Sequence, residues 1–150
     1  MKHTRRGFVG VLGLGVATAA LPESDAAPTL ALGDRAHILA RPQSKQRLID
    51  CLTGVLGCAA PQALAVPGRA EPILAFSFPS GGSLSVEFTS DALDEKDARR
   101  GAWLELRASD PAALKKRVLD AGLERVHYLA PSRFYFVVPG GQVFGIVSAT

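Results

Sequence analysis

Apolar and polar residues follow the same order of predicted elements in both halves of the chain. In the first half, an apolar run over 35–41 predicts a strand closed by Pro42. Ser44 is the expected N-cap of a helix whose apolar face repeats at helical spacing until Gly57. Three further strands are expected, at 63–66, 72–78 and 83–89.

The second half repeats this order. Four strands are expected, at 102–107, 126–129, 133–138 and 142–147. Ser109-Asp110-Pro111 is a strong helix start, and the helix predicted over 112–120 ends at Gly122. In each half a Gly-rich turn joins the last two strands as a hairpin, Pro79-Ser80-Gly81-Gly82 in the first and Pro139-Gly140-Gly141 in the second. The repeat is therefore about sixty residues long and has the order βαβββ.

Two such units predict an α+β fold. We expect one domain over 35–150, with modules at 35–89 and 101–149 and a solvated polar connector at 90–100. The eight strands would form a curved sheet around a cup, with the helices on its outer face. A ferredoxin-like α+β sandwich is the alternative, and the eighth strand disfavours it.

The first residues have the pattern of an export signal. Arg5 and Arg6 precede a Gly-rich apolar run over 8–20, which is too short to span a bilayer as a helix. The run Thr-Arg-Arg-Gly-Phe-Val resembles the twin-arginine signal, so we expect a signal peptide at 1–26, a linker at 27–34 and a periplasmic or secreted protein. Contact with the membrane would then be confined to export. Cleavage after Ala26 is favoured over cleavage after Ala19, and an uncleaved amphipathic anchor is the alternative.

Charge and cysteine content exclude some functions. The chain has 17 Lys and Arg against 14 Asp and Glu, and these charges are interspersed, so no nucleic-acid surface is expected. Cys51 and Cys58 are separated by a predicted helix, which would place their Cα atoms roughly 10 Å apart, too far for a disulfide. Buried free thiols are expected. A redox pair would require the helix to break at Gly57.

Several motifs together resemble the vicinal oxygen chelate superfamily of glyoxalases, extradiol dioxygenases and fosfomycin and bleomycin resistance proteins. They are a histidine in the first strand, the sequence SVEFT closing the first module, DPAA opening the second helix, and the final hairpin FYFVVPGGQVFGIV. The resemblance covers about 35–149. It implies the cup-shaped fold, a small-molecule ligand and, in many members, a divalent metal ion in the cup. Such proteins often form dimers, so a homodimer is compatible with it.

The resemblance also identifies four metal-ligand positions, occupied here by His37, Glu87, Trp103 and Gly145. Only His37 and Glu87 carry a metal-binding atom, because an indole N–H has no free lone pair and glycine has no side chain. Two protein ligands would leave Mn, Fe, Zn or Ni held mostly by water. We therefore expect a degenerate metal site and no cofactor.

Strand periodicity indicates which other side chains face the cup. Residues two apart along a strand share a face, so the apolar neighbours of Glu87 and Glu105 would meet the helices. The expected gap beside Gly145 would leave room for a bulky part of a ligand. The predicted lining is His37, Ser85, Glu87, Trp103, Glu105 and Arg107.

This lining supports three functional hypotheses. In the first, a binding protein stacks a flat or apolar ligand on Trp103 and meets an anionic group with Arg107 or His37. In the second, a metal-dependent lyase, isomerase or dioxygenase uses His37, Glu87 and Glu105 as a rearranged triad. The third is a structural or partner-binding subunit, which would have a cup closed by side chains and an apolar patch outside it. Structural roles compete with each of these: Glu87 is equally compatible with an ion pair to Arg107 or Arg35, and Trp103 with a place in the core.

Overall fold

The computed structural model describes residues 33–127 and 133–149. The expected signal peptide, most of the linker and the end of the strand expected at 126–129 lie outside these residues. In chain order the elements are β1 (Arg35–Ala40), α1 (Lys45–Asp50), β2 (Gln62–Leu64), β3 (Ile73–Ser77), β4 (Ser83–Phe88), α2 (Glu95–Ala98), β5 (Leu104–Ala108), α3 (Pro111–Asp120), β6 (Arg125–Val126), β7 (Phe134–Val137) and β8 (Val143–Ser148).

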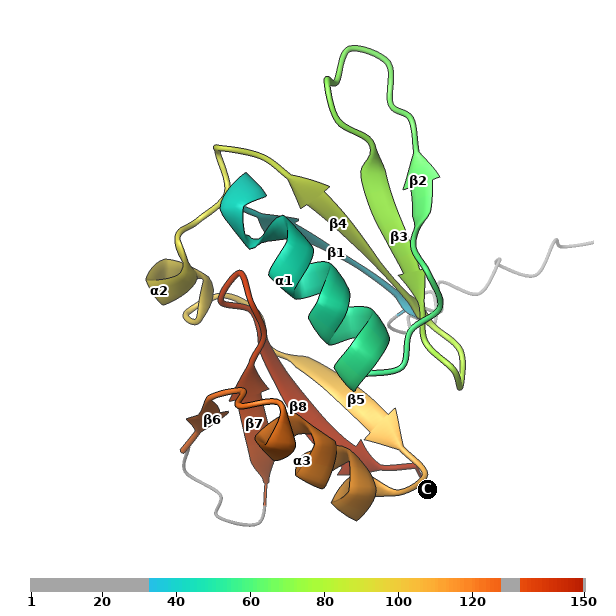
Figure 1. Ribbon diagram of the computed structural model, residues 1–150, viewed down its shortest axis with the longest axis vertical. Helices are drawn as coiled ribbons and strands as arrows, with labels where there is room; N and C mark the ends of the chain where they lie inside the picture. Colours follow the sequence, from blue (N-terminus) through green and yellow to red (C-terminus); the bar gives the residue numbers. More distant parts are fainter. Residues whose placement is uncertain (1–32, 128–132, 150) are drawn as a thin grey trace, which may run out of the picture. The chain divides into compact units, whose positions relative to one another are not determined.

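The predicted α+β fold of two βαβββ modules is confirmed. Each module forms a four-stranded mixed sheet, in the order β1-β4-β3-β2 for the first and β5-β8-β7-β6 for the second (Figure 1). In both sheets the first strand pairs parallel to the last, and the last two strands form an antiparallel hairpin. The eight expected strands are present, but backbone hydrogen bonding groups them into two sheets of four instead of one continuous sheet.

Each sheet has one face covered by a helix and an opposite face, called the open face, which is partly exposed in β4 but covered by side chains in β7 and β8. In β4, Leu84, Val86 and Phe88 are buried whereas the residues between them are partly exposed. Val86 packs in one apolar core with Leu48 of the first module and with Phe136 of the second. In Figure 1 the helices α1 and α3 lie over one sheet each. The predicted alternation of helix-facing and open-face residues is confirmed.

The helix of the first module is less regular than its sequence suggests. A 3-10 turn at Pro42–Ser44 precedes α1, and a π-helical turn at Cys51–Val55 follows it. Ser44 does not cap the helix with its side chain, because Pro42 starts the helical run two residues earlier and Ser44 itself is helical. Gly57 ends the helical run in the left-handed region with a φ of 75°, as expected for a helix-terminating glycine.

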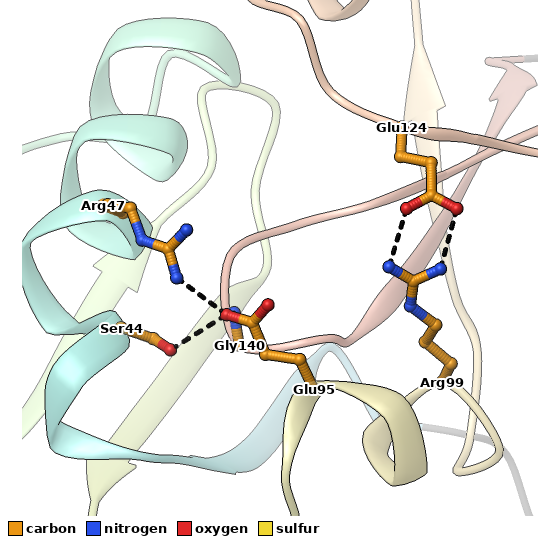
Figure 2. A network of polar contacts seen from close by, with 6 residues as sticks. All are labelled: Ser44, Arg47, Glu95, Arg99, Glu124 and Gly140. Carbon is orange, nitrogen blue, oxygen red and sulfur yellow. Dashed lines mark hydrogen bonds and ion pairs between the residues drawn. The ribbon is translucent and has the colours of Figure 1, made fainter.

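The connector at 90–100 is mostly exposed, and it also contains a short helix with specific contacts. It contains α2, which Asp94 caps by accepting from the amide of Asp97 at 2.9 Å. Glu95 Oε1 accepts from the Ser44 hydroxyl at 3.2 Å and from Arg47 at 2.8 Å, both in the first module (Figure 2). The same oxygen accepts from the amide of Gly140 in the second module at 3.2 Å. One carboxylate therefore ties the connector to both modules.

A second polar contact ties the connector to the second module. Arg99 donates two hydrogen bonds of 2.7 Å to the carboxylate of Glu124 (Figure 2). These bonds lower the pKa of the Glu124 carboxyl and raise the pKa of the Arg99 guanidinium. The charges of the predicted connector thus have specific partners, which sequence composition does not reveal.

Cys51 and Cys58 are both buried and both free, as expected. Burial is the main cause that raises the pKa of Cys51 to about 12 and that of Cys58 to about 11. Proximity to Cys58 raises the pKa of Cys51 further. Both thiols are therefore protonated at neutral pH and are poor nucleophiles.

Among the described residues, no helix has both the length and the apolar character that crossing a membrane requires.

Candidate functional site

His37, Ser85 and Glu87 lie together on the open face of the first sheet. His37 is opposite Ser85 in the parallel register of β1 and β4, and Glu87 is two residues further along β4. The Nδ1 atom of His37 lies 2.8 Å from the Oγ atom of Ser85. Its Nε2 atom lies 3.7 Å from Oε2 of Glu87. The structure thus brings the two predicted metal-ligand side chains next to one another.

Glu87 has a partner that the sequence did not indicate. Arg69, in the segment between β2 and β3, forms an ion pair with Oε1 of Glu87. This segment is held on its other side by Glu71, which pairs with Lys45 at 2.7 Å. The expectation of Arg107 or Arg35 as the partner is therefore wrong. Periodicity orders residues on strands, but it does not say where an irregular segment returns to the sheet.

Trp103 lies on the open face of the second sheet, where it packs against Tyr135. Their ring centroids are 4.9 Å apart with planes inclined by 56°. The indole N–H of Trp103 donates to the carbonyl oxygen of Arg99 at 2.9 Å. Tyr135, Val137 and Val143 form a small second core, against which Trp103 packs. The structural role of Trp103 as a core residue is thus supported directly.

The expected gap beside Gly145 does not exist, because Tyr135 fills it. Tyr135 is opposite Gly145 in the antiparallel pair of β7 and β8. A Cβ atom built on Gly145 would lie 2.7 Å from Cε1 of the tyrosine ring. Residue 145 is therefore a glycine that admits an aromatic ring of the chain itself, and the space is closed to a ligand.

Glu105 and Arg107 also lie on the open face of the second sheet, and both are exposed. Glu105 accepts from Arg133 at 2.9 Å, and the same Arg133 nitrogen donates to the Tyr135 hydroxyl at 3.3 Å. Within the parts of the chain that the structure describes, no three His, Cys, Asp or Glu side chains group closely enough to hold a metal ion. The described residues therefore give no support to a triad of His37, Glu87 and Glu105, although strand parity gives Glu105 the expected face.

A pocket of about 260 Å³ lies between β1 and the segment that enters β5. Its lining includes His37, Leu39, Asp91, Leu93, Leu104 and Gln142. Leu39 and Leu93 are 52% and 58% exposed, and both lie in this lining, so the pocket offers apolar surface to a ligand. The volume is slightly below the roughly 300–1,000 Å³ typical of small-molecule sites. Of the six side chains predicted to line a cup, His37 lines this pocket.

The remaining predicted residues lie elsewhere. Glu87 lines a second pocket of about 340 Å³, together with Arg69 and Glu71. Trp103 immediately precedes Leu104 in the chain, next to the first pocket. The contact between His37 and Glu87 therefore connects the linings of the two pockets.

The position of Tyr135, which is not in the predicted lining, could have been predicted from the sequence. Counting back from the turn Pro139-Gly140-Gly141 places residue 135 opposite residue 145 in the hairpin, so the tyrosine beside Gly145 could have been found. Arg69 and Leu93 lie in irregular segments, where neither strand nor helix periodicity applies. No local pattern could have placed them.

Solved structures with the same fold are numerous, although neither a protein-family model nor a curated protein sequence matches the chain. TnmS3, an antibiotic-binding protein of Streptomyces sp. CB03234, is 17% identical with a TM-score of 0.59, over 83% of this chain and 100% of that one. The fosfomycin resistance protein FosX of Mesorhizobium loti is 13% identical with a TM-score of 0.57, over 83% and 94%. The trypanothione-dependent glyoxalase I of Leishmania major is 14% identical with a TM-score of 0.61, over 76% and 84%.

These likenesses extend over most of each chain and concern the fold. The chain therefore has the fold of the glyoxalase and bleomycin resistance proteins, as the sequence motifs indicated. At such identities the likeness carries no ligand and no reaction from one protein to another.

Proposed function

We propose that this chain is an exported protein of the glyoxalase fold that binds a small, mainly apolar molecule in the pocket beside His37. The pocket that joins His37 to Leu39 and Leu93 is the observation that carries the proposal. Burying two half-exposed leucines against a ligand would supply a favourable hydrophobic contribution. A polar group on the ligand would meet the imidazole, which orients it. The antibiotic-binding and fosfomycin resistance proteins with this fold support a binding role.

The proposal includes binding without a resident divalent metal ion. The chemistry of the residues at the four ligand positions does not fit one: Glu87 is paired with the guanidinium of Arg69, and an indole occupies position 103. Tyr135 fills the space at position 145. The guanidinium of Arg69 thus neutralises the Glu87 carboxylate, which would otherwise be available to a metal ion. Finding about one tightly held Mn, Fe, Zn or Ni ion per chain in protein purified without chelators would overturn this part.

Anisole is a suitable first probe of the pocket, because it is small, apolar and uncharged. In an NMR titration of the ¹⁵N-labelled protein we expect it to shift the amide signals of Leu39, Leu93 and Leu104 together. Leu39→Glu should weaken anisole binding roughly fivefold or more, since a half-buried leucine contributes about 1 kcal/mol to such a contact.

Leu119→Glu is the matched control, because Leu119 is also 52% exposed but lies on α3, outside the lining of the pocket. It should leave anisole binding unchanged. Equal weakening by both variants, or shifts confined to other parts of the chain, would contradict a site at this pocket.

Export rests on the sequence of the first residues alone and has its own test. In a bacterium with the twin-arginine pathway, replacing Arg5 and Arg6 by lysine should keep the protein in the cytoplasm. Unchanged recovery from the periplasm or the medium would exclude this route.

A further inference from the structure

The contacts of Ser85 bear on which nitrogen of neutral His37 carries its hydrogen. A serine hydroxyl has a single hydrogen to donate. Ser85 donates it to the carbonyl oxygen of Ala36 at 3.2 Å. With the hydroxyl hydrogen on that carbonyl, the 2.8 Å contact between Ser85 Oγ and His37 Nδ1 would take its hydrogen from the imidazole. Neutral His37 then has its hydrogen on Nδ1, and its Nε2 atom is an acceptor.

The free acceptor of His37 faces a second acceptor. Nε2 lies 3.7 Å from Oε2 of Glu87, too far for a direct hydrogen bond. Arg69 pairs with the other carboxylate oxygen, Oε1. A donor atom placed about 2.9 Å from both Nε2 and Oε2 would fit the spacing of the two acceptors. An anionic group would instead meet a carboxylate and a lone pair, both of which repel it.

From this geometry we infer that the ligand is an apolar molecule with a hydroxyl or amine group, and that this group donates into the gap between His37 and Glu87. The inference deepens the proposed function and rests on it, because His37 lines the pocket in which the apolar part would lie. It replaces the hypothesis that His37 meets an anionic group. His37 and Glu87 thus select the ligand by its hydrogen-bond donor, while Leu39 and Leu93 contact its apolar part.

The tautomer is measured directly by ¹⁵N NMR of the imidazole in mildly alkaline buffer. We expect the hydrogen on Nδ1 in the wild-type protein. In Ser85→Ala this preference should be lost, because the acceptor of the Nδ1 hydrogen is gone. A wild-type His37 with its hydrogen mainly on Nε2 would overturn the inference, whatever the pocket binds.

The ligand class is tested with phenol and anisole, which differ by the presence of a hydroxyl hydrogen. Phenol should bind about fivefold more tightly, the worth of roughly one hydrogen bond. His37→Phe should abolish the difference between the two probes while anisole still binds. His127→Phe, which replaces an exposed histidine outside the lining of the pocket, should preserve the difference.

The two proposals fail in different ways in this experiment. If anisole shifts the pocket amides and phenol binds no more tightly, the donor inference is wrong and the binding pocket stands. If neither probe shifts those amides, the pocket is not a site for such molecules, and the inference falls with it. A preference for phenol that survives in His37→Phe would place the donor elsewhere and also overturn the inference.

Discussion

The Tyr135 ring explains why residue 145 is a glycine. The two residues are direct cross-strand neighbours in the hairpin of β7 and β8, and the Cδ1 and Cε1 atoms of the ring lie within 3 Å of where a Cβ atom of residue 145 would be. The absence of a side chain at residue 145 thus lets the chain bury an aromatic side chain in that space.

Gly145→Ala tests this packing. The added methyl group would lie 2.7 Å from the buried Tyr135 ring, which must move away. We expect the free energy of unfolding to fall by about 1–3 kcal/mol, the range typical of overpacked sites. Urea unfolding followed by circular dichroism measures this loss.

Gly54→Ala provides the control for that experiment. A Cβ atom at Gly54 would meet nothing within 4 Å, and this glycine lies in a helical turn. Alanine there should leave the protein as stable or slightly more stable. A Gly145→Ala protein as stable as wild type would show that Tyr135 does not confine residue 145.

The connector shows how a short helix gains a structural role from its surroundings. α2 has only four residues and is too short to be stable by itself. Its Glu95 nevertheless accepts hydrogen bonds from Ser44, Arg47 and Gly140, and Gly141 packs so closely on the Glu95 backbone that no side chain fits there. The helix is thus stabilised by its contacts with both modules (Figure 2).

Glu95→Ala should therefore cost more than the removal of an ordinary surface carboxylate. We expect a loss of about 1–2 kcal/mol in the free energy of unfolding, because three donors lose their acceptor at once. Glu71→Ala is the matched control: both carboxylate side chains are 48% exposed, but Glu71 pairs with Lys45 alone among the described contacts. Its loss should be below about 1 kcal/mol. Equal losses would contradict a special role for Glu95.

The two thiols of the first helical region make stability depend on alkaline pH. Their folded-state pKa values of about 12 and 11 lie above the ordinary value of 9.0. Above about pH 9 the unfolded chain therefore releases protons that the folded chain keeps, and folding becomes less favourable as the pH rises. We expect the urea midpoint to fall between about pH 8 and pH 10, and to fall less in a variant with Cys51 and Cys58 both replaced by alanine. A parallel decline in both proteins would exclude the thiols as its cause.

The two modules share one apolar core. Leu48 and Phe76 of the first module belong to the same buried cluster as Val118 and Phe136 of the second. Arg117 of α3 also donates to the carbonyl oxygen of Gly54 at 2.7 Å, across the module boundary. Neither half therefore buries its apolar face by its own sheet and helix alone.

We accordingly expect the modules to unfold together. Trp103, the single tryptophan, reports on the second module by fluorescence. Amide NMR signals of β3 and β4 report on the first. Both should show the same urea midpoint, as in a two-state transition. Two separated midpoints would show that the modules are independent.

The repeat, the α+β class and the open faces of the strands were predictable because they depend on local rules. Alternation along a strand, as in Leu84 to Phe88, follows from the two-residue period of the backbone, and glycine ends a helix wherever a left-handed residue is needed. Placing His37 beside Glu87 needed one further step, the resemblance to a known fold. The pairing of Glu87 with Arg69 could not be predicted, because the path of the segment after β2 obeys no period.

What this protein can bind depends both on its sequence and on its tertiary structure. The order of residues along the chain accounts for its strands, its two modules and the imidazole, serine and carboxylate of one sheet face. Only the packing of distant segments places Arg69 on Glu87, Tyr135 over Gly145 and Leu93 beside Leu39. The physical reason is that periodicity acts between neighbours in the chain, whereas charge pairing and close packing act between neighbours in space.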